Sequence, residues 1–433
     1  MAISFFAAIL VGTLLLLLPI STKSGHISVI DALFTSTSAV CVTGLVVQDT
    51  PAYFTLTGQI IILVLFQLGG LGIMTFSTLF LLAAGKRISI KDKIIVQEGF
   101  YHGVPKDFKS LIKNIFYFTL IIEFVGFLSL FLRWQKDFTL TKALYYSLFH
   151  SVSAFCNAGF SLFSESLITY KGDIWINITF IFLIVLGGLG FLVLQEGKKV
   201  LPAVVKRKKI HLSLHSKLVL LISLILVVFS FVLFNLIEGN LTLKQFSGQE
   251  NIISSLFQVV TPRTAGFNTV NLSSLSSATV FLLILLMFIG ASPGSTGGGV
   301  KTSTLGVIFA FLKSKVTARK SINIFYRTLP LQLVTRAFKV ISLALSVIFL
   351  VSFILLWSEP WASMEKILFE VFSAFSTVGL SLGITPQLSA ISKIAIVLTM
   401  YTGRIGPLTL LYAFSRHRAL GKFEYVEESV MIG

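Results

Sequence analysis

Charged residues are scarce in this sequence. They make up 12% of its 433 residues, whereas hydrophobic residues make up 55%. A soluble domain carries roughly 25% charged residues, so the composition excludes an ordinary soluble protein and predicts an integral membrane protein. The apolar stretches are continuous and lack the alternation of apolar and polar residues that membrane-barrel strands require. We therefore expect helices to span the membrane.

Cysteine is also scarce, and catalytic patterns are missing. Cys41 and Cys156 are the only two cysteines, which argues against a disulfide framework. No cluster of His, Cys, Asp and Glu in the sequence has the spacing of a metal or catalytic site, and there is no nucleophile elbow. We therefore do not expect an enzyme.

Basic residues outnumber acidic residues by 35 to 18. Three loops between apolar segments hold seven Lys or Arg each, at 86–113, 198–217 and 313–339. In a soluble protein this charge would favour a nucleic-acid partner, but here it follows the positive-inside rule. We expect a multi-pass protein of the plasma membrane, with these loops and both termini in the cytoplasm. Anionic membrane lipids are then the expected contacts of the basic loops, and no nucleic acid is expected.

The apolar segments come in four pairs. They lie near 3–20 and 56–84, 112–132 and 174–196, 217–237 and 278–311, and 333–357 and 390–414. Between the members of each pair lies a shorter, half-apolar segment. Because it is too short and too polar to span, it predicts a re-entrant helix followed by a loop.

Glycines relate the four pairs to one another. The glycines that end the re-entrant segments are separated by 115, 107 and 113 residues: Gly44, Gly159, Gly266 and Gly379. A second glycine follows each of them by 25, 28, 24 and 24 residues: Gly69, Gly187, Gly290 and Gly403. A repeat of this kind predicts a tandem architecture.

We therefore predict an all-α integral membrane protein of four tandem units, each a span, a re-entrant pore helix and a second span. Its eight transmembrane helices are expected in a pseudo-fourfold arrangement around a central ion pore. The predicted units are 1–88, 89–205, 206–318 and 319–415, followed by a cytoplasmic tail at 416–433. Two spans return the chain to its starting side, so the units share one orientation, unlike the inverted repeats of many secondary transporters.

The re-entrant loops predict a selectivity filter. Their residues are small, hydroxyl-bearing or aliphatic and carry no charge, so backbone carbonyls are the available ion ligands. A ring without carboxylates favours a monovalent cation over a divalent one, and the C-terminal ends of the preceding helices favour a cation. The predicted filter residues are Val42, Thr43, Gly44, Asn157, Ala158, Gly159, Thr264, Ala265, Gly266, Thr377, Val378 and Gly379.

The stretch "IGASPGSTGGGVKTST" interrupts the sixth apolar segment at 289–304. It could be a linker, a phosphate loop or a break inside the membrane. The repeat continues through it, which excludes a linker, and Val300 disrupts the spacing of a phosphate loop. We predict a movable intramembrane loop at 290–304 in the third unit, the one unit with a broken second span; a fixed kink is the alternative. The predicted gate residues are Gly290, Ala291, Ser292, Pro293, Gly294, Ser295, Thr296, Gly297, Gly298, Gly299, Lys301 and Arg404.

Five further residues stand out near the filter or inside spans. Arg404 lies within the last span, where it acts as a barrier to cations or braces the bundle. Arg263 is expected to hold its filter loop by bonding carbonyls, and the two cysteines are expected to pack behind the filter. Glu123 is a lone acid in the third span, at the bundle interior, a dimer interface or a span end.

The motifs "AVCVTG", "AFCNAG", "TPRTAGFNT" and "AFSTVG", with "GASPGSTGGGVKTST" and "MYTGRIGPLT", resemble the Trk/Ktr/HKT superfamily of potassium transporters, in particular its bacterial Ktr branch. The resemblance covers essentially the whole chain. It implies K⁺ uptake by a homodimer with one pore per subunit, often stimulated by Na⁺. It also implies gating by a cytosolic ring of nucleotide-binding RCK subunits, with no organic cofactor in this chain, and places the matching arginine in the pore.

One departure from potassium channels bears on selectivity. Those channels have Gly-Tyr-Gly filters, whereas each loop here keeps one glycine, which predicts fewer ion sites and leaves Na⁺ permeation open. A secondary transporter with alternating access is the alternative of another class. The shared orientation of the units and the near absence of acids within the spans argue against it.

Overall fold

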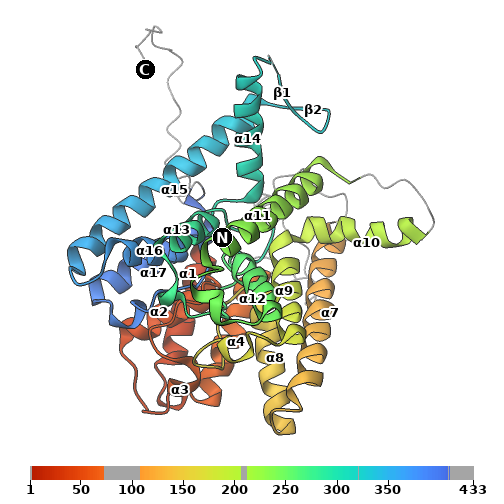
Figure 1. The fold of residues 1–433 in the computed structure, drawn as a ribbon. Coiled ribbons are helices and arrows are strands. Elements are labelled where there is room, and N and C mark those ends of the chain that lie inside the picture. Colours follow the sequence, from red (N-terminus) through yellow and green to blue (C-terminus); the bar gives the residue numbers. More distant parts are fainter. Residues whose placement is uncertain (1, 73–107, 206–211, 320, 408, 410–433) are drawn as a thin grey trace.

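The computed structural model describes residues 2–72, 108–205, 212–319, 321–407 and 409, and they are almost entirely helical (Figure 1). Most of the basic loop at 86–113, the boundary between 88 and 89, and the tail at 416–433 lie outside these residues.

The elements follow the predicted order of units. The first two units contain α1 (Ala2–Leu16), α2 (Val29–Val40), α3 (Thr50–Tyr53) and α4 (Leu56–Leu71), then α7 (Phe108–Trp134), α8 (Leu140–Cys156), α9 (Ile174–Leu189) and α10 (Phe191–Val205). The last two contain α11 (Leu214–Glu238), α12 (Gly248–Val260), α13 (Ser277–Phe288) and α14 (Thr302–Val316), then β1 (Ile322–Ile324), β2 (Arg327–Leu329), α15 (Leu331–Ser358), α16 (Met364–Ser376) and α17 (Ala390–Ile405).

A small antiparallel hairpin departs from the expected all-helical fold. Strands β1 and β2 pair with Ile322 opposite Leu329. In Figure 1, α14 stands out from the bundle with this hairpin at its far end, and α15 returns toward α16 and α17. The hairpin therefore joins the third unit to the fourth.

The re-entrant helices α2, α8, α12 and α16 form where the sequence predicts them. Serine N-caps begin three of them, because the side chains of Ser28, Ser247 and Ser363 accept bonds from backbone N–H groups of the first turn. The Phe that recurs before each filter glycine is fully buried, as Phe34, Phe149, Phe257 and Phe369.

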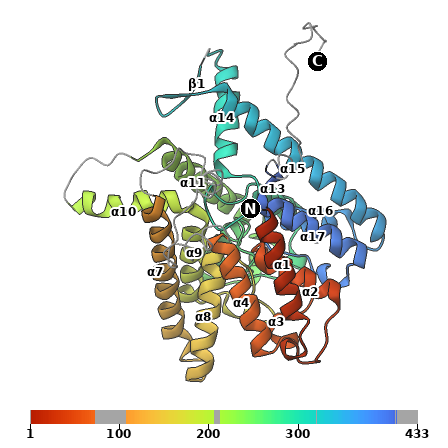
Figure 2. The ribbon, with the colours of Figure 1, turned by 180° about the vertical axis from the view of Figure 1, so that it is seen from behind.

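Each re-entrant helix packs against the second helix of the preceding unit. Helix α8 contacts α4, α12 contacts α9, and α16 contacts α13. Helix α2 contacts α17, so the last unit packs against the first, and Figure 2 shows α1, α2 and α17 side by side. The helices therefore close on themselves in a circle.

In every unit the second helix ends partway through its predicted segment, whereas the sequence predicts a break only in the third. Helices α4, α9 and α17 end at Gly72, Gly190 and Gly406, which have φ angles of 78°, 92° and 93°. Glycine adopts such a positive φ at little steric cost, so it can end a helix where another residue would be strained. The continuous segments predicted at 56–84, 174–196 and 390–414 are therefore wrong where the structure describes them.

These interruptions shorten the apolar helices. In the described part of the chain, three helices are long and apolar enough to cross a membrane alone, at Lys113–Trp134, Leu214–Glu238 and Leu331–Ser358. Helices α9 and α10 pass the same test together but meet at an angle of 103°. The long helices are the first helices of units two, three and four.

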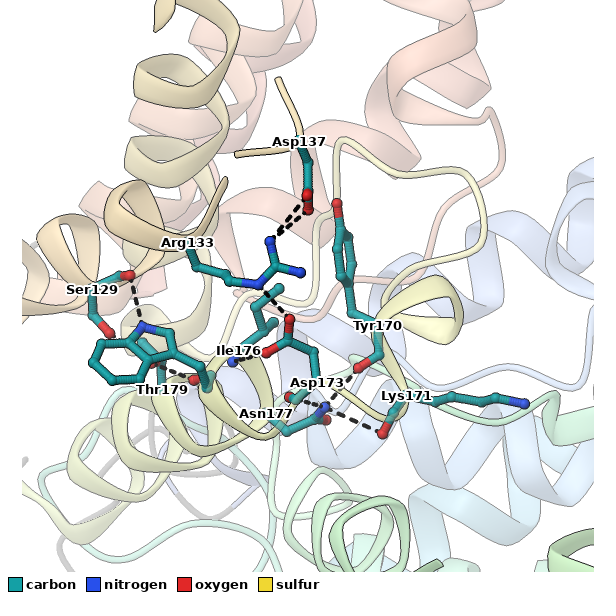
Figure 3. A network of polar contacts seen from close by, with 10 residues as sticks. Ser129, Arg133, Asp137, Tyr170, Lys171, Asp173, Ile176, Asn177 and Thr179 are labelled. Carbon is teal, nitrogen blue, oxygen red and sulfur yellow. Dashed lines mark hydrogen bonds and ion pairs between the residues drawn. The ribbon is translucent and has the colours of Figure 1, made fainter. Parts of the chain in front are cut away.

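Polar side chains join the first and second helices of unit two at their ends, as Figure 3 shows. Arg133 at the end of α7 donates from Nε to Asp173 Oδ2 at 2.6 Å and from Nη1 to Asp137 at 3.0 Å. Asp173 also caps α9, accepting a bond from the backbone N–H of Ile176. Asn177 donates to the Tyr170 carbonyl at 2.8 Å. These bonds fix the ends of α7 and α9 relative to each other.

Units three and four use a carboxylate at the corresponding place. Glu238, the last residue of α11, accepts bonds from the backbone N–H and hydroxyl of Ser276, the N-cap of α13, at 2.9 and 2.7 Å. Glu359 follows α15 and accepts a bond from the backbone N–H of Ser389, the N-cap of α17, at 2.7 Å. A carboxylate is favourable there because the N-terminal end of a helix is electropositive.

Candidate ion-conducting site

The four glycines at the ends of the re-entrant loops lie next to one another in a ring. All have left-handed backbones, with φ angles between 70° and 91°. A Cβ on Gly266 would lie 2.5 Å from Val378 O and 3.0 Å from Gly159 Cα. A Cβ on each glycine would meet one carbonyl oxygen of a neighbouring unit: that of Ala158 for Gly44, Ala265 for Gly159, Val378 for Gly266 and Thr43 for Gly379. Neither the space nor the backbone conformation admits a side chain here.

The residue two positions before each glycine is also left-handed. The φ angles are 57°, 57°, 74° and 52° at Val42, Asn157, Thr264 and Thr377. Three of these residues are β-branched, for which this conformation is a true outlier. Strained backbone persists only where the surrounding structure imposes it, and it clusters at ligand sites. The sequence gives no warning of this strain.

All twelve predicted filter residues lie in this ring. Of these, the eight that are not glycine are fully buried, whereas Gly159, Gly266 and Gly379 are partly accessible. The side chains therefore point into the protein, and the backbone at these three glycines borders the accessible space. Asn157 Nδ2 also donates to Thr264 Oγ1 at 3.3 Å, which links neighbouring loops.

Hydroxyl groups in the last turns of the re-entrant helices hold these loops, which was not predicted from the sequence. The backbone N–H of Gly44 donates to Ser38 Oγ, and that of Gly379 to Ser373 Oγ, both at 3.1 Å. Ser153 Oγ donates to the Phe160 carbonyl at 2.7 Å. In the third unit Thr261 Oγ1 donates to the Phe267 carbonyl at 2.6 Å. Their common offset of six residues before the glycine, five in the third unit, is the pattern that could have found them.

The glycine-rich loop lies against the ring. Its two ends pair in an isolated bridge between Ile289 and Val300, and α14 begins at Thr302, so the loop is shorter than the predicted 290–304. The Gly298 N–H donates to Thr377 Oγ1 at 2.9 Å. A Cβ on Gly297 would collide with Thr264. The loop thus contacts the filter residues of units three and four.

The same loop is bonded to the interrupted helix of unit two. The Ser292 N–H donates to the Gly188 carbonyl at 3.0 Å, and Thr296 Oγ1 donates to the Gly187 carbonyl at 3.2 Å. The Phe191 N–H, at the start of α10, donates to the Gly294 carbonyl at 2.9 Å. The break in unit two therefore supplies the backbone groups that hold the loop of unit three.

Two cations also hold the loop. The Arg404 guanidinium donates to the carbonyls of Thr296 in the loop and Gly69 in α4. Lys301 Nζ donates to the carbonyls of Gly297 and Gly298 at 2.6 and 3.2 Å. Within the described residues no carboxylate pairs with either side chain. The structure therefore brings the predicted gate residues together, with two basic side chains beside the ring.

The expected role of Arg263 is wrong. Its side chain is 7% exposed, and Nη2 donates to Ser223 Oγ of α11 at 2.8 Å rather than to filter carbonyls. The third unit has one residue fewer between Phe257 and Gly266 than the others have between their Phe and glycine. Helix α12 ends at Val260 with the right-handed C-cap Thr261, so five residues separate the helix from Gly266. The loop therefore leaves the helix in another direction, and Arg263 reaches the neighbouring helix.

Glu123 lies in the bundle, behind the loop of the second unit. Its Oε2 accepts a bond from Gln67 Nε2 of α4 at 3.2 Å. Cys156 Sγ donates to Gln67 Oε1 at 3.2 Å, and both cysteines are buried and free. Of the three locations left open by the sequence, the structure favours the bundle interior for Glu123.

Comparison with known proteins gives a consistent result. The sequence profile described as cation transport protein, TrkH, matches residues 3–424. The chain is 40% identical to Ktr system potassium uptake protein B of Bacillus subtilis, covering 96% of this chain and 92% of that protein. It is 37% identical to the potassium/sodium uptake protein NtpJ of Enterococcus hirae, covering 100% and 96%.

Its fold is similar to that of the potassium transporter TrkH from Vibrio parahaemolyticus, with a TM-score of 0.71 and 20% identity over 96% of this chain and 85% of that one. The profile match and the full-length relatives confirm the resemblance drawn from the filter motifs. The chain belongs to the TrkH family of cation transport proteins.

Proposed function

We propose that this protein is the K⁺-conducting membrane subunit of a Ktr-type uptake system. The observation that carries the proposal is the closed ring of four left-handed glycines, three of which border accessible space while the neighbouring side chains are buried. Potassium uptake by the similar protein of Bacillus subtilis supports the choice of ion. In this proposal the chain forms eight membrane segments in four pseudo-fourfold units, with the pathway along their common axis.

The proposed filter consists of backbone carbonyls from the twelve residues of the ring. Carbonyls replace the hydration shell of a monovalent cation, and none of the twelve is acidic. The C-terminal ends of α2, α8, α12 and α16 add negative potential. Because each loop has one left-handed glycine, we infer fewer binding layers than in a potassium channel. Sodium is thus the second ion to test, as the name of the Enterococcus hirae protein also indicates.

The loop at 290–301 is the proposed gate. It fills the space beside the ring, and Arg404 fastens it to α4 of the first unit. The positive charge of Arg404 there repels a cation that leaves the filter. Opening requires that Arg404 release at least one carbonyl and that the loop leave Thr377. In this proposal a cytosolic RCK ring that binds nucleotide causes the opening, and it acts on a homodimer of this chain through α14 and the hairpin.

Flux measurements test this function. The purified protein, reconstituted in liposomes, should pass rubidium down its gradient without any second solute, and added K⁺ should slow that flux more than added Na⁺. It should also restore growth at low K⁺ to a bacterium without K⁺ uptake. Rubidium flux that depends strictly on a co-substrate would instead favour alternating access, and a protein with no cation flux would contradict the proposal.

A further inference from the structure

A second set of buried polar residues lies in the re-entrant helices, away from the ring itself. It occupies the position nine residues before each filter glycine, or eight in the third unit with its deletion. We call this the anchor position. Each of its members is at most 2% exposed: Thr35, His150, Gln258 and Glu370. A helix inside a membrane bundle could hold apolar side chains here, so four polar ones need an explanation.

In the second unit the anchor residue bonds the chain that follows the filter. His150 Nε2 accepts a bond from the backbone N–H of Leu162 at 3.2 Å and lies 3.2 Å from Ser161 Oγ. Because Nε2 accepts, Nδ1 carries the proton that bonds the Tyr146 carbonyl at 2.8 Å. Ser161 is the second residue after Gly159.

In the fourth unit a carboxylate makes the equivalent contact. Ser381, the second residue after Gly379, donates from Oγ to Glu370 Oε2 at 2.8 Å. Thr385 Oγ1 donates to the other carboxylate oxygen, Glu370 Oε1. Both serines also accept a bond from the backbone N–H two residues further on, at 2.9 Å for Ser161 and 3.0 Å for Ser381. The two units thus share one arrangement built from different acceptors.

The first and third units lack this contact. Thr35 Oγ1 and both polar atoms of Gln258 have no hydrogen-bond partner among the described residues. The second residue after the glycine is Val46 in the first unit and Asn268 in the third. The Asn268 carbonyl instead accepts a bond from the Leu167 N–H of the second unit. In the second and fourth units, therefore, the chain that follows the filter glycine is hydrogen-bonded to the re-entrant helix of the same unit.

We propose that His150 and Glu370 are positioning residues that fix the chain immediately after the filter glycine and so set how well the ring distinguishes K⁺ from the smaller Na⁺. This inference rests on the proposed function. A carbonyl ring prefers the larger ion only if its oxygens cannot collapse onto the smaller one. A bond from a buried helix to the second residue after the glycine limits that movement.

The bonds carry more weight than their number indicates, because a buried acceptor that loses its donors is left unsatisfied. Glu370 has two hydroxyl donors from the same loop, so movement of that loop would cost both bonds. The loop is thereby coupled to a helix that cannot shift without disturbing the bundle.

The test compares Ser381→Ala and Glu370→Leu with Glu370→Gln, which keeps an acceptor, and with Thr35→Val as the matched control. Thr35 occupies the same helical position, and its hydroxyl bonds none of the described residues. The readout is the ratio of rubidium to sodium flux in liposomes. We expect Ser381→Ala and Glu370→Leu to lower the ratio about threefold to tenfold, the double variant to lower it no further, and Glu370→Gln and Thr35→Val to stay near wild type.

The outcomes separate this inference from the proposed function. Wild-type protein without rubidium flux would overturn both. If wild type conducts but Ser381→Ala keeps its flux ratio, the positioning role is wrong and the function stands. An equal loss in Thr35→Val would assign the effect to helix packing, and a Glu370→Gln variant as poor as Glu370→Leu would assign it to charge; either contradicts the proposal. If Glu370→Leu fails to elute as a single species in gel filtration, Ser381→Ala decides.

Discussion

At the scale of single residues, the positions of the ring glycines impose two requirements that only glycine meets among the amino acids. Each has a left-handed backbone, and each approaches the next unit so closely that a Cβ would overlap a carbonyl or a Cα. Gly25 has the first property alone, because its φ is 74° and a Cβ there would meet no atom within 4 Å. Substitutions at a ring glycine and at Gly25 therefore separate the energetic cost of a side chain at positive φ from the cost of its close contact with the next unit.

Gly266→Ser should reduce rubidium-to-sodium selectivity by about tenfold, because its Cβ would lie 2.5 Å from Val378 O and displace a carbonyl of the ring. Gly25→Ser, with the same backbone strain in open space, should cost some stability but keep selectivity. Flux ratios in liposomes measure the first, and melting temperatures in detergent measure the second. Equal selectivity in the Gly266→Ser variant and wild type would contradict the assigned filter.

Arg404→Ala should raise basal rubidium flux, because the side chain fastens the loop to α4 and adds a positive charge beside the ring. Arg404→Lys should leak less than Arg404→Ala, since an ammonium keeps the charge but lacks the planar fork that reaches two carbonyls. Flux from protein that elutes normally in gel filtration is the measurement. A well-folded Arg404→Ala variant with unchanged or lower flux would show that the arginine is only a brace.

At the scale of elements, the capping carboxylates hold first and second helices together. Burial by itself would raise the pKa of Glu359, but hydrogen bonds from Ser389, Ser392 and Trp361 outweigh it and hold that pKa below its ordinary value. Since the folded-state pKa is depressed, the carboxylate contributes stability above the unfolded-state pKa of about 4.3. That contribution is lost as the pH falls through the folded-state value.

The Glu359→Gln variant should therefore lose less stability than wild type when the pH falls from 6 to about 3.5, a range that brackets the unfolded-state pKa. At pH 6 it should be the less stable protein by about 1–2 kcal/mol, because a neutral acceptor replaces a charged one. Apparent melting temperatures of the detergent-solubilised proteins provide the comparison. Parallel pH dependences of the two proteins would mean that the capping bond does not titrate.

The sequence predicts the elements better than their ends. The four re-entrant helices and the ring glycines follow from one repeat, because the same physical requirement recurs in each unit. The breaks at Gly72, Gly190 and Gly406 do not, because a glycine in an apolar segment is equally compatible with a continuous helix. At Gly190 a tertiary contact accompanies the break, because a Cβ there would lie 2.5 Å from the Pro293 carbonyl oxygen.

The candidate site also contains some features that could be predicted from the sequence and others that could not. Its glycines and the loop could be predicted, since glycine marks a backbone that other residues cannot adopt. The left-handed Val42 and Thr377 could not, because residue type disfavours that conformation and only the surrounding bundle imposes it. The contact of Arg263 could not be predicted either, because a one-residue deletion redirects the chain, and the spacing reveals the deletion but not the new direction.

At the scale of the whole molecule, the loop is bonded to every unit of the circle directly or through Arg404, but it leaves the bundle by one route. That route is α14, which follows the loop at Thr302 and extends to the hairpin outside the bundle (Figure 1). Helix α14 packs on α11, where a Cβ on Gly306 would lie 3.0 Å from Leu218 Cγ. Displacement of the loop toward the open state therefore requires α14 to slide on α11.

A cysteine pair, Gly306→Cys with Leu218→Cys, can lock this contact, because the two Cβ atoms lie within reach of a disulfide. Placed in the leaky Arg404→Ala background, the oxidised pair should reduce rubidium flux several-fold, and a thiol reductant should restore it. Leu218→Cys alone, beside the buried native cysteines, should not respond to oxidation. If oxidation crosslinks the pair but leaves the leak intact, the loop moves without α14. A cytosolic partner that pulls on the hairpin could not then be what opens the pore.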